Sequence, residues 1–218
     1  MKGSKKLTPT VFIILALLVI PSPGVAASGQ LSSYIQKYRQ VTLHDSVHQR
    51  LSDYDEMIEY FTSLHYFVPR HRVNADFLRA LIIAESSVDQ RATSPKDARG
   101  LTQIIYETGQ RAARELIGRQ FPFRYVNMAK LKNLHPQDLY DPAINILIAS
   151  FLISKYNHKY DGRLDLVVAA WNAGEGAIRN NQPPPYRETL DLIGKVNGYY
   201  LALLKSNSYL VSTVRKNR

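Results

Sequence analysis

Apolar side chains recur along most of the chain at the three- and four-residue spacing that is typical of helices with one buried face. One such stripe begins near Asp53 and is closed by Pro69. A second begins near Asn74, whose side chain can cap a helix, and ends at Glu85. No series of alternating apolar and polar residues indicates a sheet, so the pattern predicts an all-α, or mainly α, domain.

The second half of the chain carries clear helix boundaries. Asp141-Pro142 combines a capping side chain with a proline at the first helical position, and the apolar stripe that follows predicts the central helix. The apolar run 164–171 predicts a short buried helix rather than a strand, with Gly174 in its C-terminal turn. A last helix is expected over 187–204.

The connecting segments are less regular. We expect a turn-rich connection over 86–103 that can form one wall of a cleft, because Ser94-Pro95 and Gly100 break any regular period. A helix is predicted over 108–117, and the stretch 119–136 is expected to be mostly irregular. Residues 28–45 show no clear apolar period, which predicts a linker or a frayed helix that tolerates truncation.

The first 27 residues have the pattern of a secretory signal. Three lysines precede the apolar stretch 11–20, and prolines interrupt the chain before Ala26-Ala27. Ten apolar residues are fewer than the roughly 20 that span a bilayer, so cleavage near Ala27 is predicted and an uncleaved anchor is the alternative. A periplasmic or secreted protein is therefore expected. Without cysteines it depends on packing for stability.

The charge of the chain indicates what kind of partner it meets. The formal net charge of +10 falls by three, to +7, when the three leader lysines are removed. Outside the cytoplasm such a charge favours anionic cell-wall polymer or a lipid surface over nucleic acid. Peripheral contact with the membrane or with cell-envelope machinery is left open, as is the oligomeric state. His44 and His48 lack a third ligand nearby, so neither a metal nor a cofactor is expected.

Glu85 is the main candidate for chemistry. A glutamate at the end of an apolar helix loses water, and burial disfavours its charged form, so the carboxyl can retain a proton near neutral pH. A general acid that cleaves a glycosidic bond needs this property. Taken alone, however, such a residue is more often an exposed glutamate at a helix end.

Several blocks around Glu85 occur together in one order. They are Ala84-Glu85-Ser86, Ser94-Pro95, Gly100-Leu101-Thr102-Gln103, Asp141-Pro142 with Asn145-Ile146, Ala170-Trp171-Asn172-Ala173-Gly174, and Arg187-Glu188-Thr189. In order and spacing this set resembles the catalytic domain of soluble lytic transglycosylases, which are relatives of goose-type lysozymes. The resemblance covers about 53–204. Together with the signal-like leader, this predicts a signal peptide (1–27), an N-terminal extension (28–52), the transglycosylase domain (53–204) and a C-terminal tail (205–218).

The resemblance implies a lysozyme-like helical domain with a substrate cleft, and peptidoglycan strands as the partner. The bond cleaved would join N-acetylmuramic acid to N-acetylglucosamine. Glu85 matches the single catalytic acid of the family, which protonates the bridging oxygen and then accepts the proton of the muramyl C6 hydroxyl. That hydroxyl attacks C1 and closes a 1,6-anhydro ring, so no water and no second carboxylate are needed.

Other roles follow from matched positions. Ser94 resembles a serine that bonds near the sugar acetamido group, and Gln103 and Asn172 resemble polar groups beside the acid. Trp171 stands where the family usually has tyrosine; it can stack on a sugar or be a core aromatic, but it cannot accept a hydrogen bond as a phenol can. Ser86 either caps the helix end or contacts substrate.

Two departures from the family pattern affect the expected site. Thr102 replaces a usual methionine, which would trim an apolar contact in the cleft. Leu192 replaces a usual tyrosine whose hydroxyl lies near the catalytic acid. Two alternatives therefore stay open: a lysozyme-type hydrolase with Asp89 as a water-activating carboxylate, and a peptidoglycan-binding or assembly module without turnover.

Overall fold

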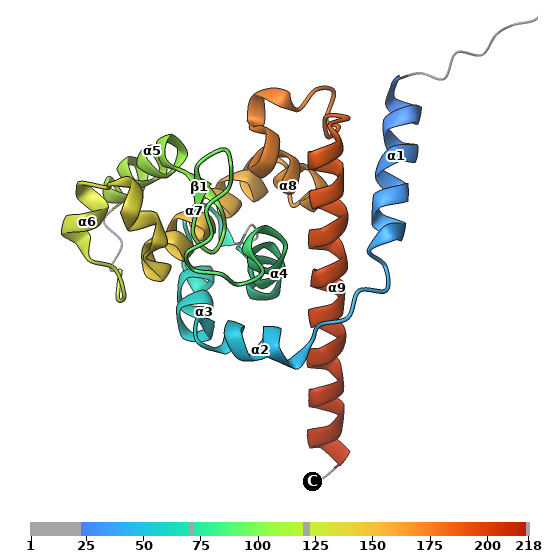
Figure 1. The fold of residues 1–218 in the computed structure, drawn as a ribbon, viewed down its shortest axis with the longest axis horizontal. Helices are drawn as coiled ribbons and strands as arrows, with labels where there is room; N and C mark the ends of the chain where they lie inside the picture. The colour runs from blue at the N-terminus through green and yellow to red at the C-terminus, as the bar shows by residue number, and fades with distance from the viewer. Residues whose placement is uncertain (1–22, 70–71, 120–122, 217–218) are drawn as a thin grey trace, which may run out of the picture.

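The computed structural model describes residues 23–69, 72–119 and 123–216 as a predominantly helical protein (Figure 1). Most of the expected signal peptide lies outside these residues. In chain order the elements are α1 (Pro23–Lys37), α2 (Asp45–Ser52), α3 (Asp55–Ser63), α4 (Ala75–Ser86), β1 (Ala98–Arg99), β2 (Ile104–Ile105), α5 (Tyr106–Ile117), α6 (Met128–Lys132), η2 (Pro136–Tyr140), α7 (Pro142–Lys159), α8 (Leu164–Ala173), η3 (Glu175–Ala177) and α9 (Arg187–Lys216). The all-α prediction is confirmed.

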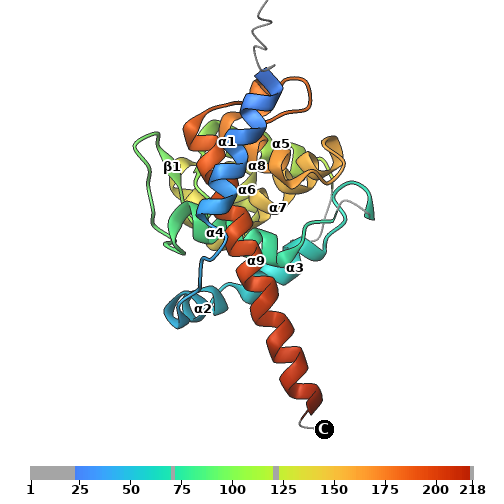
Figure 2. The same cartoon turned by 90° about the vertical axis from the view of Figure 1, so that its right-hand side faces the viewer.

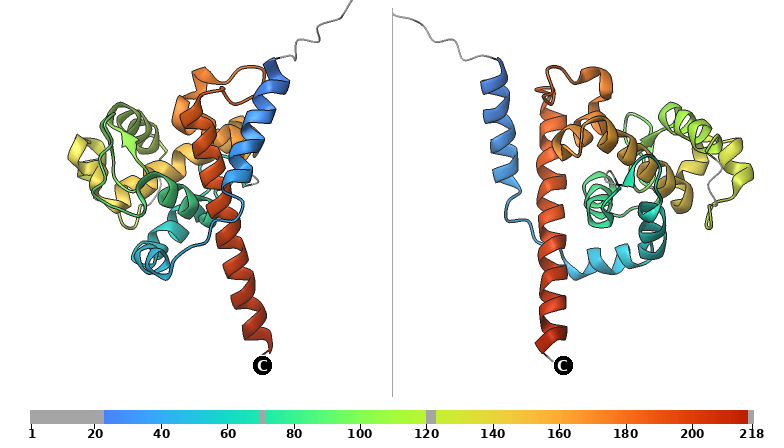
Figure 3. Two further views of the ribbon diagram at one scale, coloured as in Figure 1. Left: turned by 45° about the vertical axis from the view of Figure 1, so that its right-hand side comes forward. Right: turned by 180° about the vertical axis from the view of Figure 1, so that it is seen from behind.

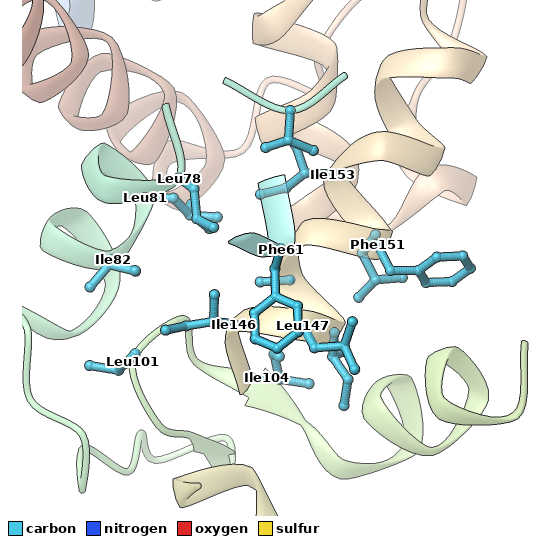
Figure 4. Close-up of a cluster of buried hydrophobic side chains, with 14 of the residues drawn as sticks. Phe61, Leu78, Leu81, Ile82, Leu101, Ile104, Ile146, Leu147, Phe151 and Ile153 are labelled. Atoms are coloured by element: carbon cyan, nitrogen blue, oxygen red, sulfur yellow. The ribbon is translucent and has the colours of Figure 1, made fainter. Parts of the chain in front are cut away.

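Helix α7 is the central helix, as its sequence predicts. The side chain of Asp141 accepts hydrogen bonds from the backbone N–H groups of Ala143 (3.0 Å) and Ile144 (3.4 Å), and Pro142 occupies the first turn. Nearly every residue of α7 is buried, because other elements surround it. Figure 4 shows its side chains Ile146 and Leu147 beside Phe61 of α3. This core is the frame on which the cleft is built.

Helix α4 ends where its apolar stripe ends. Asn74 caps its start by accepting a hydrogen bond from the Phe77 N–H at 3.1 Å, as expected. At the other end Ser87 adopts a left-handed conformation, with φ of 53°, which stops the helix after Ser86. The last turn therefore lies at the border between the core and the connection that follows.

That connection is fixed to the core by one buried amide. Asn145 of α7 accepts hydrogen bonds from Thr102 through its N–H (3.0 Å) and its hydroxyl (2.7 Å), and donates to the carbonyls of Leu139 (2.8 Å) and Arg99 (3.1 Å). A Cβ at Gly100, whose φ is 78°, would collide with this amide. Thr102 is thus fully buried and does not line the cleft, and the loss of an apolar cleft contact at this position stays a prediction.

Within this connection the short strands β1 and β2 form an antiparallel pair. Gly118 follows α5 as predicted. The stretch 119–136 is more regular than expected, because the Asn127 side chain caps helix α6 by accepting from two N–H groups. Helix α8 ends at Ala173, with Gly174 at a φ of 79°, so the prediction of a helix there is confirmed.

The last helix is longer than expected. Helix α9 continues through 205–216, which we expected to form a tail, and in the figures its C-terminal end projects beyond the rest of the protein (Figures 1 and 2). No glycine or proline interrupts this stretch, so nothing in the sequence ends the helix. Within the described residues, no helix has both the length and the apolar character that crossing a membrane requires.

Helix α1 lies alongside α9, which the absence of an apolar period did not predict (Figures 2 and 3). Two glycines of α9 allow the contact: a Cβ at Gly194 would lie 2.6 Å from the Tyr34 carbonyl oxygen, and one at Gly198 would lie 2.5 Å from that of Tyr38. Lys37 and the Tyr38 hydroxyl also donate to Asp191, at 2.7 and 2.9 Å. The segment is thus part of the packed structure and not a linker.

Candidate active site

A cleft of about 210 Å³ opens beside the last turn of α4. One wall is the connection from α4 to α5, and the other comes from the end of α8 and the start of α9, with α7 between them. The lining residues are Glu85, Ser94, Lys96, Ala98, Gln103, Ile104, Ile105, Thr108, Leu152, Tyr156, Trp171, Asn172 and Glu188. The structure thus brings together five predicted site residues, Glu85, Ser94, Gln103, Trp171 and Asn172.

Glu85 has the environment of a protonated acid. Its side chain faces the cleft, but most of its surroundings are protein, and this loss of water raises the pKa of the carboxyl to about 7. The indole N–H of Trp171 donates a hydrogen bond to Oε1 of Glu85 at 2.9 Å, which opposes the rise in pKa. The negative charge of Glu188 raises the pKa further, and Lys195 lowers it. Burial is the largest effect.

Trp171 therefore acts as a hydrogen-bond donor to the acid, a role that its sequence position did not indicate. We expected a ring that stacks on a sugar or packs in the core, whereas its N–H is directed at the acid. Leu192, which replaces the family tyrosine, is buried among apolar side chains and offers no donor. The hydrogen bond that Glu85 accepts comes from α8.

The remaining polar residues of the cleft hold its walls in place. The Ser94 hydroxyl oxygen accepts from the N–H groups of Lys96 (3.2 Å) and Ala98 (3.1 Å). The Gln103 amide donates to the carbonyls of Ala92 (3.1 Å) and Gly100 (2.9 Å). Their contacts with a substrate stay predictions.

On the opposite wall, the Asn172 side-chain oxygen accepts from the Thr189 hydroxyl at 2.6 Å. This bond joins the end of α8 to the start of α9, so it fixes the wall that carries Trp171 and Glu188. A substrate role for Asn172 is likewise a prediction.

Two candidates lie away from the cleft. The Ser86 hydroxyl donates to the carbonyl of Ile82 at 3.2 Å, one turn earlier in the same helix, and does not line the cleft. Asp89 is exposed in the connection, where its carboxylate accepts from the Arg91 N–H at 2.8 Å. It therefore lacks the position that a water-activating carboxylate would need.

Two charged residues of the cleft were missed by the sequence reasoning. Lys96 and Glu188 form an ion pair with 2.6 Å between Nζ and Oε2, which joins the two walls. Glu188 belongs to the motif block Arg187-Glu188-Thr189, but the resemblance implied no role for its side chain. Lys96 follows the Ser94-Pro95 block. Its contact with Glu188 of α9 depends on how distant segments pack in the fold, which the neighbouring sequence does not indicate.

A family model for the transglycosylase SLT domain matches residues 68–189, which is more than half of the chain. The chain belongs to this family. The relationship inferred from the ordered motif blocks is thereby confirmed. All six blocks lie within the matched region of the SLT domain, and the last of them, Arg187-Glu188-Thr189, ends at its final residue.

Individual relatives agree with this membership. Over 106 residues the chain is 29% identical to a Haemophilus influenzae protein described as "Putative soluble lytic murein transglycosylase". The matched region is 49% of this chain and 16% of that protein. The structure of the 70 kDa soluble lytic transglycosylase of Escherichia coli is similar, with a TM-score of 0.54 at 20% identity, over 67% of the chain and 23% of that protein.

A second solved structure is equally similar. An inactive mutant of the lytic transglycosylase Slt from Pseudomonas aeruginosa matches with a TM-score of 0.54 at 20% identity, over 70% of the chain and 24% of that protein. These similarities establish the SLT-type helical fold. The chain spans only about a quarter or less of the length of each of these relatives.

Proposed function

We propose that this SLT-domain protein is a peptidoglycan lytic transglycosylase, which cleaves the bond between N-acetylmuramic acid and N-acetylglucosamine without water. The observation that carries the proposal is the state of Glu85, a carboxyl whose pKa burial raises to about 7, at the wall of a cleft and with a defined hydrogen-bond donor. A carboxyl in this state holds a proton for a leaving oxygen and can accept one afterwards.

The reaction proceeds in two proton transfers at Glu85. In the first, the carboxyl protonates the glycosidic oxygen, so that the C1–O bond breaks and the glucosamine leaves as an alcohol. In the second, the carboxylate accepts the proton of the muramyl C6 hydroxyl while that oxygen bonds to C1. The Trp171 N–H stabilises the carboxylate between the two transfers. The acid is regenerated and water is not consumed.

The other carboxylate that lines the cleft is Glu188, which forms an ion pair with Lys96 in the free protein. Glu188 is largely exposed, and its hydrogen bond with Lys96 keeps the pKa of this carboxyl below its usual range. A hydrolase would use a second carboxylate to activate water or to form a glycosyl-enzyme. Because Glu188 is largely exposed to solvent and Asp89 lies outside the cleft, the geometry favours attack by the substrate's own hydroxyl.

Product analysis tests the proposal. Purified peptidoglycan is digested with the full chain, and the released fragments are examined by mass spectrometry. We expect 1,6-anhydromuramyl ends, and a loss of at least about 100-fold in rate for Glu85→Gln, which keeps the shape of the side chain but has no acidic proton to donate. Reducing muramyl ends would instead identify a hydrolase, and wall binding without any release would identify a binding module.

We also propose that the protein acts in the periplasm or outside the cell, on the wall itself. The basic charge of the chain and the signal-like pattern of 1–27 support this location. Fractionation of cells that express the full chain tests it, because mature protein shortened near Ala27 should appear in the periplasmic or secreted fraction. Full-length protein in the membrane fraction would indicate a retained anchor.

A further inference from the structure

An exposed ion pair spans the mouth of the cleft. Lys96, from the connection after α4, and Glu188, from the first turn of α9, both line the cleft and lie 2.6 Å apart. Their side chains are 69% and 63% exposed, so both charges remain in contact with water. Among the described residues that line the cleft, Lys96 alone carries a positive charge.

The backbone that carries Lys96 is held firmly. The Ser94 hydroxyl oxygen accepts from the N–H of Lys96 and from that of Ala98, and the Ser94 and Ala98 backbones bond to each other at 2.9 Å. Asp97, at a φ of 62°, is paired with Arg99 at 2.6 Å. The turn is thus fixed, whereas the long side chain of Lys96 is free to change partners.

The pairing with Glu188 is easily exchanged. An exposed ion pair changes an equilibrium by only about fivefold or less, because water solvates both charges when they separate. Without Lys96, the charged form of Glu188 would still be stabilised, because the side chain is mostly solvated and the Asn172 amide also lowers its pKa. An anionic group that enters the cleft can therefore replace Glu188 as the partner of Lys96 at little cost.

We propose that Lys96 is a specificity-determining residue that binds a carboxylate carried by the muramyl residue of the substrate. The inference rests on the proposed function, because a wall glycan supplies such carboxylates on the lactyl group or on the peptide attached to it. In the free protein Glu188 forms the ion pair with Lys96, and the substrate carboxylate displaces it when the strand binds. Chitin-type sugars, which have no carboxylate, would gain nothing from Lys96.

Binding measurements with full-length chains that carry Glu85→Gln test the inference without interference from cleavage. Three probes are compared: glycan strands with their peptides, amidase-treated strands with free lactyl carboxylates, and chitooligosaccharides. Lys96→Met should weaken binding of carboxylate-bearing strands by about three- to tenfold and leave chitooligosaccharide binding unchanged. A loss confined to peptide-bearing strands identifies a peptide carboxylate, because their lactyl carboxyl is bound in an amide. A loss confined to amidase-treated strands identifies the lactyl carboxylate, and a loss on both strand types shows that Lys96 accepts either carboxylate.

The opposite variant separates recognition from structural support. Glu188→Gln frees Lys96, so it should strengthen binding of the same strands, whereas a bridge that merely held the two walls would make both substitutions weaken binding. Lys159→Met serves as the matched control, because Lys159 forms an ion pair of 2.8 Å with Glu175 and neither lines the cleft. It should leave all three affinities unchanged.

Three results would overturn the inference: no effect of Lys96→Met on any probe, an equal loss on chitooligosaccharides, or weakening by both substitutions. In each of these cases anhydro products from the unsubstituted chain would still support the proposed function. Conversely, reducing products would change the reaction that we propose and leave carboxylate binding by Lys96 intact.

Discussion

The protonation state of Glu85 is set mainly by two opposing effects, the loss of water on burial and one hydrogen bond from Trp171. Burial favours the neutral carboxyl, and the Trp171 N–H favours the carboxylate, with burial the larger effect. Sequence reasoning located Glu85 and its desolvation, because an apolar helix that ends in a glutamate is a local feature. It missed the role of Trp171, since the bond joins residues of two helices whose crossing is set by the whole core.

Replacing Trp171 should move the pH dependence of activity. Trp171→Phe removes the donor that stabilises the carboxylate, so the pKa of Glu85 rises above about 7. The alkaline limb of the rate profile, which reports loss of the acid proton, should shift to higher pH. Trp171→Tyr keeps a polar hydrogen at this position and is the control. A profile for Trp171→Phe that coincides with the original would contradict the assignment.

Glu85 should also make stability depend on pH. Its pKa is about 7 in the folded protein and near 4.5 when unfolded, so ionisation disfavours the fold and stability falls as pH rises from about 4.5 through 7. Glu85→Gln does not ionise, and its oxygen can still accept from Trp171. Between pH 4 and 8 the variant should gain of the order of 3 kcal/mol relative to the original chain. Parallel stability curves from urea unfolding would refute this.

At the scale of elements, boundaries marked by a local capping residue were predictable and long-range packing was not. The stripe expected to be closed by Pro69 ends earlier, because α3 stops at Ser63. Asn74, Asp141 and Gly174 mark helix ends through contacts within a few residues, and the structure has each of them in that place. The packing of α1 on α9 has no such signal. It depends on Gly194 and Gly198 meeting residues about 160 positions earlier, a contact that no pattern within α9 indicates.

The contact between α1 and α9 yields a test by glycine replacement. In an exposed helix, Gly→Ala stabilises by up to about 1 kcal/mol. At Gly198 the new methyl group would lie 2.5 Å from the Tyr38 carbonyl oxygen, so overpacking should dominate and Gly198→Ala should destabilise by about 1 to 3 kcal/mol.

Gly29 is the control for this test, because it lies in α1 with no atom near its would-be Cβ. Gly29→Ala should be neutral or stabilising in the same thermal or urea unfolding experiment. If Gly198→Ala matched it in sign and size, Tyr38, the residue that follows α1, would not lie against α9 as described.

For the whole molecule, the core places the acid and its donor on elements that are distant in the sequence. Helix α4 delivers Glu85, the end of α8 delivers Trp171, and both helices pack against α9. The ordered motif blocks predicted this family and fold correctly, because five of the six blocks contribute a residue to the cleft and the block with Asn145 fixes the connection that forms one wall. The extra length of α9 and the position of α1 lie outside the blocks and were not predictable from them.

The central claim is that the C6 hydroxyl of the substrate, and not water, replaces the leaving sugar at Glu85. The most direct measurement is digestion of peptidoglycan in water labelled with heavy oxygen, followed by mass spectrometry of the released muropeptides. We predict anhydro products that contain no label, and no products with Glu85→Gln. Label incorporated at the muramyl C1 position would show that water attacks, and would contradict the account.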